Sequence, residues 1–592
     1  MTFQELANYF QLLEQTSARL KITEILAQLF KKSRAEEVEK ITYLSLGMLV
    51  PPYEGLEFQM AEKMIIRAVA KAFGVENSLV QKEYKQVGDL GTVGEELKKK
   101  GGGGKIQNRL FVKEKKSDVK LSVNEVFERL LTIAKEAGTG SVERKIEKMA
   151  TLLEDLDALS VRYVIRVPLG KLRLGFSDLT VLDALSWMES GNKSLRPELE
   201  AAFNVRADIG AIAKRVKEAG AKGVKDTKPV VGTPILPALA QRLGTVEEML
   251  EKMGMVVMEP KYDGTRLQIH LKRYKKETEV RIFTRNLENV TAMFPDIAEA
   301  VEKEVKAEEA ILDSEGVGID PKTGRFLPFQ ETIKRKRKHG IEATAKEIPL
   351  RCFVFDILYK DGKSLLPSPL LERRKILEKI LPAKPNVLII SPQVVADRPE
   401  EMREFHKEQI KKGLEGAMVK KANAPYEAGR RGFSWVKYKQ EETKKGGGLA
   451  DTIDCVIMGT YRGRGKRAGF GVGAFLVGVR QGEKFNTVSK IGTGLTDEQW
   501  QEIKVRSSKF KVQSRPAEYE VDKNLTPDSW VRPAIVVEIQ ADNITKSPIH
   551  TVSLALRFPR LVRFRDDRSP QDATTVKEVE KLYQLQFGAG KE

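Results

Sequence analysis

The first part of the chain carries apolar residues at helical spacing. One such series is Phe3, Leu6, Ala7 and Phe10, and a second runs from Val142 to Leu156. This period places the apolar side chains on one face of an α-helix. We therefore predict a mostly helical domain over residues 1–222, followed by a linker at Asp226–Pro234, where proline and glycine interrupt the pattern.

The pattern changes to that of strands after this linker. Met255–Met258 is a short apolar run, and Leu267, Ile269 and Leu271 alternate with polar residues, as in a half-buried strand. We expect strands to dominate as far as Lys439, with helical insertions near residues 299–306 and 399–412. This mixture predicts an α+β domain over residues 223–445.

A second linker is predicted at Glu441–Gly448, which is polar and ends in three glycines. Short strand-like runs follow it, at Cys455–Met458, Phe475–Val479 and Ile535–Ile539. Several short strands separated by turns are typical of a small β-barrel. We therefore predict a third domain, a barrel, over residues 446–592.

Lys261 stands in a polar turn between two of the predicted strands, in the sequence Lys261-Tyr262-Asp263-Gly264. A lysine held there can act as a nitrogen nucleophile if its surroundings remove its proton, which is costly because the pKa of a free lysine is about 10.4. Nearby cations and a bound metal ion would lower that cost. Taken alone, the segment is more typical of an ordinary Asp-Gly hairpin.

Further polar groups follow in order, each beside a short apolar strand. They are Arg285, Glu315, Phe355 with Asp356, Glu415, Lys420, Arg431, and the pair Lys437 and Lys439, which alternation places on one strand face. Any one of them is explained as well by charges that decorate a strand edge. The ordered series is not explained in that way, and we interpret it as one site.

The residue types in this series suit a nucleotide. A lysine attacking an α-phosphate needs cations to neutralise developing charge and carboxylates to hold a divalent ion. Mg²⁺ is commonly held by one or two carboxylates with water and phosphate, a role that fits Glu315 and Glu415, and carboxylates suit Mn²⁺ as well. Phe355 offers a ring for stacking on a purine. The sequence contains no Walker-type phosphate loop, and its four histidines are scattered.

The ordered segments resemble the nucleotidyltransferase motifs of the ATP-dependent DNA ligases of archaeal and eukaryotic replicative type. The resemblance is carried by Lys261–Gly264, Thr284–Val290, Asp313–Glu315, Phe355-Asp356, Glu415-Gly416 and Trp435–Lys439. Upstream, Leu169–Gly175 is similar to the family's DNA-binding-domain signature. Downstream, Ala541–Pro548 and Leu556–Arg560 are similar to its OB-fold domain.

The resemblance implies a multidomain fold: an all-α DNA-binding domain (1–222), an α+β adenylation domain (223–445) and a β-barrel OB-fold domain (446–592). It also implies a reaction. Lys261 would take AMP from ATP, the AMP would pass to a 5′-phosphate at a nick in duplex DNA, and the 3′-hydroxyl would displace it. Such an enzyme would serve DNA replication, repair and recombination.

The same resemblance gives roles to single residues. Lys261 is implied to be the adenylated nucleophile, Glu259 to contact the adenine edge and Phe355 to stack on adenine. The other implied ATP-binding residues are Arg266, Arg285, Glu315, Arg431, Lys437 and Lys439, and the implied Mg²⁺ ligands are Glu315 and Glu415.

Three positions depart from the family pattern. Thr265 replaces a larger polar residue, and Ser314 replaces the glycine that often precedes the acid, which we expect to add a hydroxyl beside the metal ligand Glu315. The C-terminal motif ends Arg565-Asp-Asp-Arg568, with arginine where lysine is usual. That exchange keeps the charge but not the geometry and affects the expected engagement of pyrophosphate.

Bulk properties agree with a DNA partner. The net charge is +19, and neutralising phosphates with such a surplus releases counterions. Only two cysteines are present, and the sequence has no signal peptide and no apolar run near bilayer length. We expect a monomer in the cytoplasm, nucleoid-associated in a prokaryote, that has no membrane partner. No clear sliding-clamp peptide is present, and the sequence leaves that partner open.

Alternative functions remain to be weighed. An RNA ligase or a capping guanylyltransferase shares the lysine turn, but these lack a helical domain of this size before it. An NAD-dependent DNA ligase carries a four-cysteine zinc site, which two cysteines cannot build. From another class, a noncatalytic DNA-clamping protein with a decayed site is disfavoured by the complete set of acids, lysines and arginines. The sequence does not decide between ATP, ADP and GTP.

Overall fold

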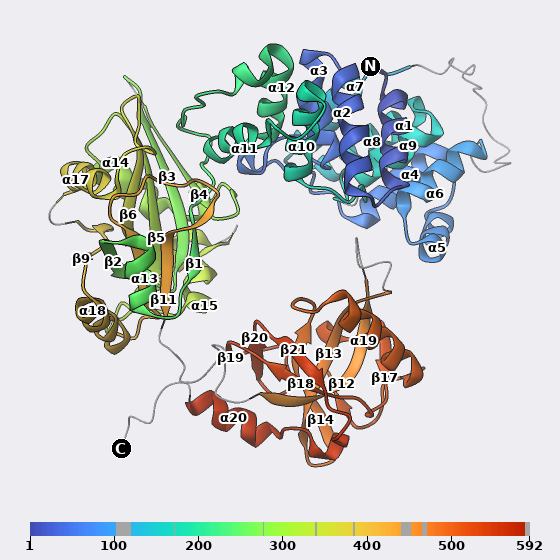
Figure 1. Ribbon diagram of the computed structural model, residues 1–592. Coiled ribbons are helices and arrows are strands. Elements are labelled where there is room, and N and C mark those ends of the chain that lie inside the picture. The colour runs from blue at the N-terminus through green and yellow to red at the C-terminus, as the bar shows by residue number, and fades with distance from the viewer. Residues whose placement is uncertain are drawn as a thin grey trace. The chain divides into compact units, whose positions relative to one another are not determined.

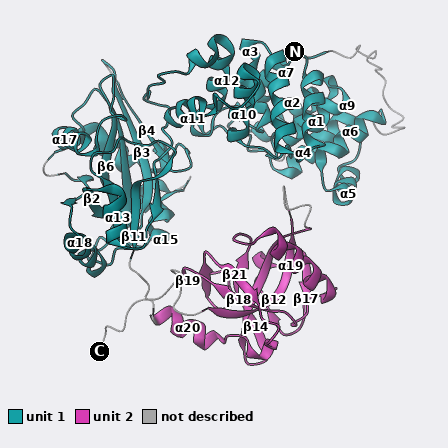
Figure 2. Ribbon diagram, in the orientation of Figure 1, with its two compact units in different colours: residues 1–439 teal, residues 440–592 magenta. Residues whose placement is uncertain are grey.

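The computed structural model describes residues 1–101, 120–170, 172–275, 277–337, 340–382, 385–439, 452–463 and 471–585. The chain divides into two compact units, residues 1–439 and 440–592 (Figure 2). No helix in the described ranges is both long and apolar enough to cross a membrane.

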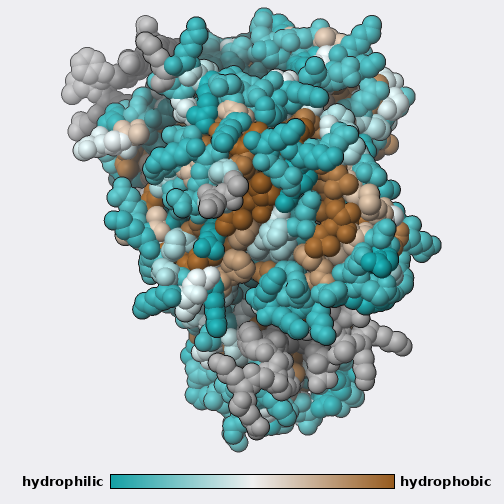
Figure 3. Space-filling model, turned by 90° about the vertical axis from the view of Figure 1, so that its left-hand side faces the viewer, coloured by the Kyte–Doolittle hydropathy of each residue, from teal (hydrophilic) through white to brown (hydrophobic). Residues whose placement is uncertain are grey.

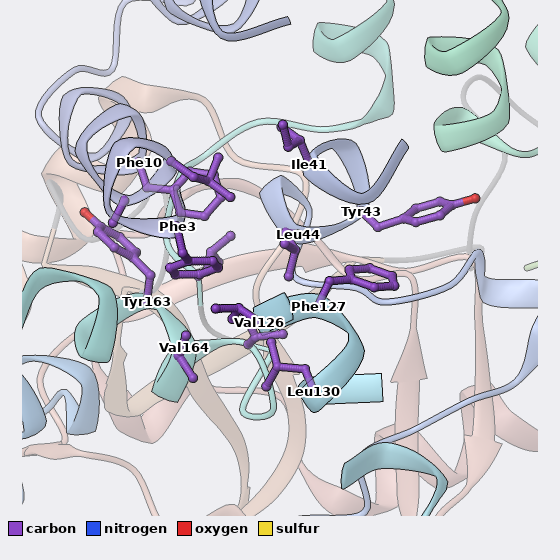
Figure 4. Close-up of a cluster of buried hydrophobic side chains, with 14 of the residues drawn as sticks. Phe3, Phe10, Ile41, Tyr43, Leu44, Val126, Phe127, Leu130, Tyr163 and Val164 are labelled. Atoms are coloured by element: carbon purple, nitrogen blue, oxygen red, sulfur yellow. The ribbon is translucent and has the colours of Figure 1, made fainter. Parts of the chain in front are cut away.

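The N-terminal part of the first unit is helical, as predicted (Figure 1). Its helices are α1 (Phe3–Glu14), α2 (Arg19–Lys32), α3 (Ala35–Ser45), α4 (Glu62–Phe73), α5 (Asn77–Val87), α6 (Leu90–Lys99), α7 (Val123–Lys135), α8 (Ser141–Asp155), α9 (Ala158–Arg166), α10 (Asp178–Ser190), α11 (Arg196–Val205) and α12 (Ile209–Ala219). The first apolar series read from the sequence lies inward, whereas Val142, which begins the second, is 45% exposed. Side chains from α1, α3, α7 and α9 meet in one core (Figure 4). Aromatic burial of this kind contributes strongly to folding because each ring removes a large apolar area from water.

Two sheets form the rest of the first unit. The first has the strand order β1-β11-β10-β2-β9 and the second β4-β3-β5-β6-β7, with β8 beside β6. The strands are β1 (Leu239–Arg242), β2 (Val256–Pro260), β3 (Thr265–Arg273), β4 (Thr278–Thr284), β5 (Glu309–Gly318), β6 (Leu350–Lys360), β7 (Lys363–Ser364), β8 (Leu388–Ile390), β9 (Val394–Ala396), β10 (Gly416–Lys421) and β11 (Arg431–Lys439).

Helices cover the outer face of each sheet. Helices α13 (Val246–Met253) and α18 (Pro399–Lys411) share an apolar core with β2, β10 and β11, whereas α14 (Pro295–Glu304) and α17 (Leu370–Ile380) share another with β3, β5 and β6. Two short helices, α15 (Phe329–Thr332) and α16 (Ile341–Glu347), follow β5. A third cluster contains Ile311, Leu358 and Trp435 and joins the inner faces of the two sheets. Residues on those inner faces therefore meet between the sheets.

The second unit is built mainly from strands. They are β12 (Ile453–Arg462), β13 (Val472–Gln481), β14 (Lys484–Ile491), β15 (Lys511–Val512), β16 (Tyr519–Glu520), β17 (Ser529–Val531), β18 (Val536–Gln540), β19 (Asn543–Lys546), β20 (Leu554–Arg557) and β21 (Arg560–Phe564), with helices α19 (Asp497–Lys509) and α20 (Val576–Leu585). Eight of the strands form one sheet, and β19 pairs with β20. The strand-rich character is as predicted. The predicted linker Glu441–Gly448 lies outside the described residues.

One face of the molecule can be followed by its hydropathy. Figure 3 shows a face that is mostly hydrophilic, with apolar residues gathered near its middle.

Both cysteines, Cys352 and Cys455, are buried and form no disulfide. Burial raises the pKa of the Cys352 thiol to about 12, so this side chain behaves as a small apolar group.

Candidate active site

Lys261 lies where the chain crosses from one sheet to the other. Strand β2 ends at Pro260 and β3 begins at Thr265, so the four residues Lys261–Gly264 are the whole connection. The Lys261 backbone N–H donates to the Gly416 carbonyl oxygen at 3.0 Å, which holds the turn to β10. A Cβ at Gly264 would stand 2.5 Å from the Gly316 carbonyl oxygen, so only glycine fits against β5 there. The predicted turn between strands is confirmed.

A cavity of about 430 Å³ opens beside this turn. Of the residues singled out from the sequence, those that line it are Glu259, Lys261, Arg266, Arg285, Glu315, Phe355, Arg431 and Lys437. Lys261 and Arg285 lie in the turns that follow β2 and β4, and the others come from strands of both sheets, where alternation directs their side chains to the inner faces. Glu415 and Lys439 lie next to this group, where Glu415 forms an ion pair with Lys261. The structure thus brings all ten predicted site residues into one neighbourhood.

Glu415 is held between two lysines. Its carboxylate pairs with Lys261 and, at 3.1 Å, with the Lys439 Nζ. Burial raises the pKa of Glu415, but attraction to Lys261 and Lys439 outweighs burial and lowers that pKa to about 2. Glu415 is therefore ionised throughout the physiological range, and its charge fixes the position of the Lys261 amine.

Glu315 lies in a different electrostatic setting. It is partly buried in the cavity wall, and desolvation raises the pKa of its carboxyl to about 7, although Arg266 and Lys261 oppose the shift. A raised pKa signals a carboxylate that lacks enough positive charge around it. Such a group, with Glu415 nearby, fits a Mg²⁺ ion that completes its shell with water and phosphate. The described residues contain no cluster of three or more side chains that would hold a metal ion without such help.

Three cations of the cavity face open space. The side chains of Arg285, Arg431 and Lys437 form no ion pair with any described residue. Burial, together with repulsion from Lys261, Arg285 and Lys439, lowers the pKa of Lys437. Crowded positive charge in a partly dry cavity favours an anionic ligand, because the ligand relieves the repulsion.

Arg266 is fixed by protein groups. Its guanidinium donates from Nε to Asp313 Oδ1 at 3.0 Å and from Nη2 to Asp313 Oδ2 at 2.6 Å, and it also reaches the Ala238 carbonyl oxygen at 2.8 Å. The same group lies 5.6 Å from the ring centroid of Phe355 and 5.2 Å from that of Trp435. Arg266 therefore lines the cavity as a rigid, aromatic-packed cation.

Ser314 lies on the opposite face from the one we expected. Its Oγ donates to the Leu267 carbonyl oxygen at 2.8 Å and accepts from Cys352 Sγ at 3.1 Å, and the residue is fully buried. Alternation along β5 turns Ser314 toward the core and Glu315 toward the cavity. The prediction that this hydroxyl would lie beside the metal ligand is wrong.

Some functional neighbours were given no role from the sequence. Lys420 lines the cavity, and its Nζ donates to Glu259 Oε2 at 2.8 Å, while Asp313 anchors Arg266 and Trp435 closes one side. Their partners are far away in the sequence, so local spacing carries no sign of them. Lys420 stood in the ordered polar series that we interpreted as one site, and alternation places it on the same face of β10 as Met418, but neither signal identified its partner.

The C-terminal motif has its own contacts within the second unit. Arg565 Nη1 lies 3.0 Å from Asp454 Oδ2, and Arg565 Nη2 lies 2.8 Å from Asp567 Oδ2. Arg568 Nε lies 3.6 Å from Asp454 Oδ2. Asp454 thus forms ion pairs with both arginines of the motif. Two basic, glycine-rich segments, Lys98–Gly104 and Tyr461–Arg467, extend beyond the described residues at 102–104 and 464–467.

Replacing Gly416 with alanine should slow any reaction at Lys261. Gly416 has a φ of +131°, and an added Cβ would overlap the Tyr438 carbonyl oxygen, so β10 and β11 would have to move apart. Both Glu415 and the carbonyl that holds Lys261 would move with them. We expect at least a tenfold lower rate of covalent labelling of Lys261 by nucleotide, measured by intact-protein mass spectrometry over time.

Gly413→Ala is the matched control for that variant. Gly413 also has a positive φ, +79°, but a Cβ there meets nothing within 4 Å. Its replacement adds backbone strain without the overlap. Equal labelling rates for the two variants would show that the overlap at Gly416 does not matter.

Comparison with known proteins agrees with this site. Three family models match the chain: DNA ligase N terminus at residues 2–186, ATP dependent DNA ligase domain at residues 237–439, and ATP dependent DNA ligase C terminal region at residues 468–568. A relative from Dictyoglomus turgidum named Probable DNA ligase is 44% identical, with 99% of this chain and 98% of the relative covered. A DNA ligase of Acidianus ambivalens is 39% identical, with the same coverage of each.

One solved structure, named Pmar-Lig_Pre, resembles the chain in fold. It is 16% identical, has a TM-score of 0.54, and is matched over 95% of this chain and 99% of its own. The sheets, the lysine turn and these matches together define an enzyme of the nucleotidyltransferase type. The chain belongs to the family of ATP-dependent DNA ligases.

Proposed function

We propose that this ligase seals nicks in duplex DNA that carry a 5′-phosphate and a 3′-hydroxyl, through AMP bound covalently to Lys261. The observation that carries the proposal is the position of the Lys261 amine, at the wall of a cavity that also presents Arg285, Arg431 and Lys437 without ion-pair partners among the described residues. A nucleophile beside unneutralised cations is suited to attack on a phosphate ester.

In the first step, the Lys261 Nζ would attack the α-phosphorus of ATP. A nitrogen–phosphorus bond forms, the bond from that phosphorus to the bridging oxygen breaks, and pyrophosphate leaves. Before attack the amine must lose a proton, because only the neutral amine carries the electron pair that forms the new bond. The ion pair with Glu415 keeps the amine in place until the nucleotide is bound.

Mg²⁺ is the metal that we assign to this step, with Mn²⁺ as an alternative. Glu315 and Glu415 would hold it, and when bound it would neutralise charge on the phosphates. Phe355, half-buried on β6, offers its ring to the purine, and Glu259 offers a carboxylate to the base edge. Arg266, fixed by Asp313, would border the ribose.

In the later steps, a DNA 5′-phosphate oxygen would take the AMP from Lys261, breaking the nitrogen–phosphorus bond. The 3′-hydroxyl oxygen would then attack the 5′-phosphorus, and AMP would leave as the phosphodiester forms. We propose that the helical domain binds the duplex and that the C-terminal β region is an OB-fold domain. The net charge of +19 supports sequence-independent contact with phosphates. The place of action would be the cytoplasm, and replication, repair and recombination would be the processes served.

Intact-protein mass spectrometry tests this proposal. Incubation with ATP and Mg²⁺ should add the mass of one AMP, and nicked DNA should remove it while joined strands appear on a gel. Parallel incubations with NAD, ADP and GTP identify the nucleotide, and a nicked RNA duplex serves as the competing acceptor. Absence of a mass gain with every nucleotide, or faster discharge to RNA than to DNA, would contradict the proposal.

A further inference from the structure

Two buried charges of opposite sign lie at the base of the cavity. Glu259 on β2 and Lys420 on β10 are 2% and 1% exposed, and the Lys420 Nζ lies 2.8 Å from Glu259 Oε2. In the pairing of the two strands, Lys420 stands opposite Val257 and Met418 stands opposite Glu259. The two charges are therefore diagonal neighbours on one face, within reach of each other.

The second oxygen of the Glu259 carboxylate makes no such contact with the described residues. Glu259 Oε1 is buried and has no hydrogen-bond partner among the described residues, although both Glu259 and Lys420 line the cavity. A buried carboxylate oxygen without a partner is costly, which indicates that a ligand supplies the missing donor.

Aromatic rings enclose the lysine. The Lys420 Nζ lies 4.4 Å from the ring centroid of Phe355 and 4.4 Å from that of Trp435. Their faces favour a cation, so the ammonium is stabilised by two rings and one carboxylate in a dry setting. Lysine at this position thus has a fixed location and a charge that the surroundings support.

We propose that Lys420 is a positioning residue that sets the choice of purine, by holding Glu259 as a carboxylate whose free oxygen can only accept a hydrogen bond. The inference depends on the proposed function, because it presumes that a purine nucleotide enters the cavity to react with Lys261. It adds a residue that acts through Glu259 and does not itself react.

An acceptor-only group discriminates between purines by their six-position. Adenine presents an amino group, which donates, whereas hypoxanthine and guanine present a keto oxygen, which would face the carboxylate oxygen without a hydrogen between them. A buried polar group left unpaired by the wrong ligand gives strong rejection, stronger than a difference in shape alone. A protonated carboxyl would lose this selectivity, because it could donate to the keto oxygen.

The charges around Glu259 decide whether it keeps its proton. Burial raises the pKa of Glu259, Lys420 opposes that rise, Arg374 on α17 adds a weaker opposing effect, and Asp356 on β6 adds to the rise. Asp356 is itself paired with Arg373, and Arg374 donates to the Ser391 carbonyl oxygen. Loss of Lys420 removes the main opposing charge, so the carboxyl would take up a proton at a higher pH than in the unaltered protein.

The test compares Lys420→Met with the unaltered ligase, using ATP and inosine triphosphate as probes. Initial rates of covalent nucleotide addition to the full chain, measured by intact mass over a range of concentrations, give kcat/KM for each. We expect the unaltered protein to prefer ATP by about 1,000-fold or more and Lys420→Met to lower this preference at least tenfold. Lys420→Arg should restore most of it because the charge is kept.

Lys421→Met is the matched control. It makes the same replacement one residue later on β10, at an exposed side chain on the other face, and should leave the preference unchanged. The pH profile adds a readout that lost packing would not move. Relative to the unaltered protein, ATP addition by Lys420→Met should rise with pH and inosine triphosphate addition should fall, as Glu259 loses its proton.

A second variant decides the question if Lys420→Met does not fold. Glu259→Gln with Lys420→Met removes both charges and supplies an amide N–H that can donate to a keto group, so its preference should shift toward inosine triphosphate. An unchanged preference in a folded variant would overturn the inference, even though the same protein still accepts AMP. Absence of AMP addition in the unaltered protein would instead overturn the proposed function.

Discussion

Replacing Lys261 with alanine should abolish the sealing of an ordinary nick and preserve the sealing of a nick that already carries AMP on its 5′-phosphate. The first substrate needs AMP from the lysine, whereas the second needs only attack by the 3′-hydroxyl. Loss of the nucleophile should lower sealing of the ordinary nick by about four orders of magnitude or more. Strand joining on denaturing gels, with equal enzyme and both substrates, measures the two rates.

Lys421→Ala is the control for Lys261→Ala, since it removes an exposed lysine elsewhere in the same sheet. It should seal both substrates at the rate of the unaltered protein. If Lys261→Ala sealed neither substrate while keeping its affinity for nicked DNA, the lysine would serve a later step as well. If it sealed both, the nucleophile would have to be another residue.

Replacing Asp313 with asparagine should destabilise the first unit. Asp313 is 1% exposed and accepts hydrogen bonds from Arg266 Nε, Arg266 Nη2 and the Tyr426 hydroxyl. Asparagine keeps the shape but leaves the Arg266 charge without a partner, which costs about 3 kcal/mol in the free energy of unfolding. Urea unfolding followed by tryptophan fluorescence should show a lower midpoint for the first unit.

Glu299→Gln provides the comparison for an exposed pair. Glu299 pairs with Lys303 on the surface of α14, with both side chains more than half exposed. Water screens such a pair, so the urea midpoint should not move. Asp313→Asn would also loosen Arg266 from the rings of Phe355 and Trp435, so nucleotide addition should weaken even where the protein remains folded. An unchanged midpoint would mean that Arg266 finds a new partner or water.

The strands around the lysine turn could be predicted because the residue pattern that specifies them is local in the sequence. Leu267, Ile269 and Leu271 alternate with polar residues, and all three are fully buried in the core that β3 shares with α14. Helix α17 was missed within the region read as strands, and α13 lies before that region, in a segment to which no element was assigned. Helix α17 is densely charged, and its three buried apolar residues Leu370, Leu377 and Ile380 become a helical face only against their neighbours.

The sequence predicted which residues come together at the site, but not the contacts that they make with one another. The order of motifs gave Lys261, Glu315 and Glu415, since each follows a recognisable strand pattern. The partners Asp313 of Arg266 and Lys420 of Glu259 depend on which strands lie side by side. That pairing is decided by packing over long sequence separations, which a single sequence does not display. Applying alternation to β5 would have predicted the inward position of Ser314.

The connection of four residues between β2 and β3 limits how this protein can vary. Its backbone is hydrogen-bonded to β10 at Lys261 and fits against β5 at Gly264, so each end belongs to a different sheet. One inserted residue would shift β2 or β3 by one position against its neighbours, and every side chain of that strand would then exchange the core face for the cavity face. Single substitutions within Lys261–Gly264 can therefore have effects of different size on the protein. A change in the length of this segment should instead prevent the two sheets from folding correctly.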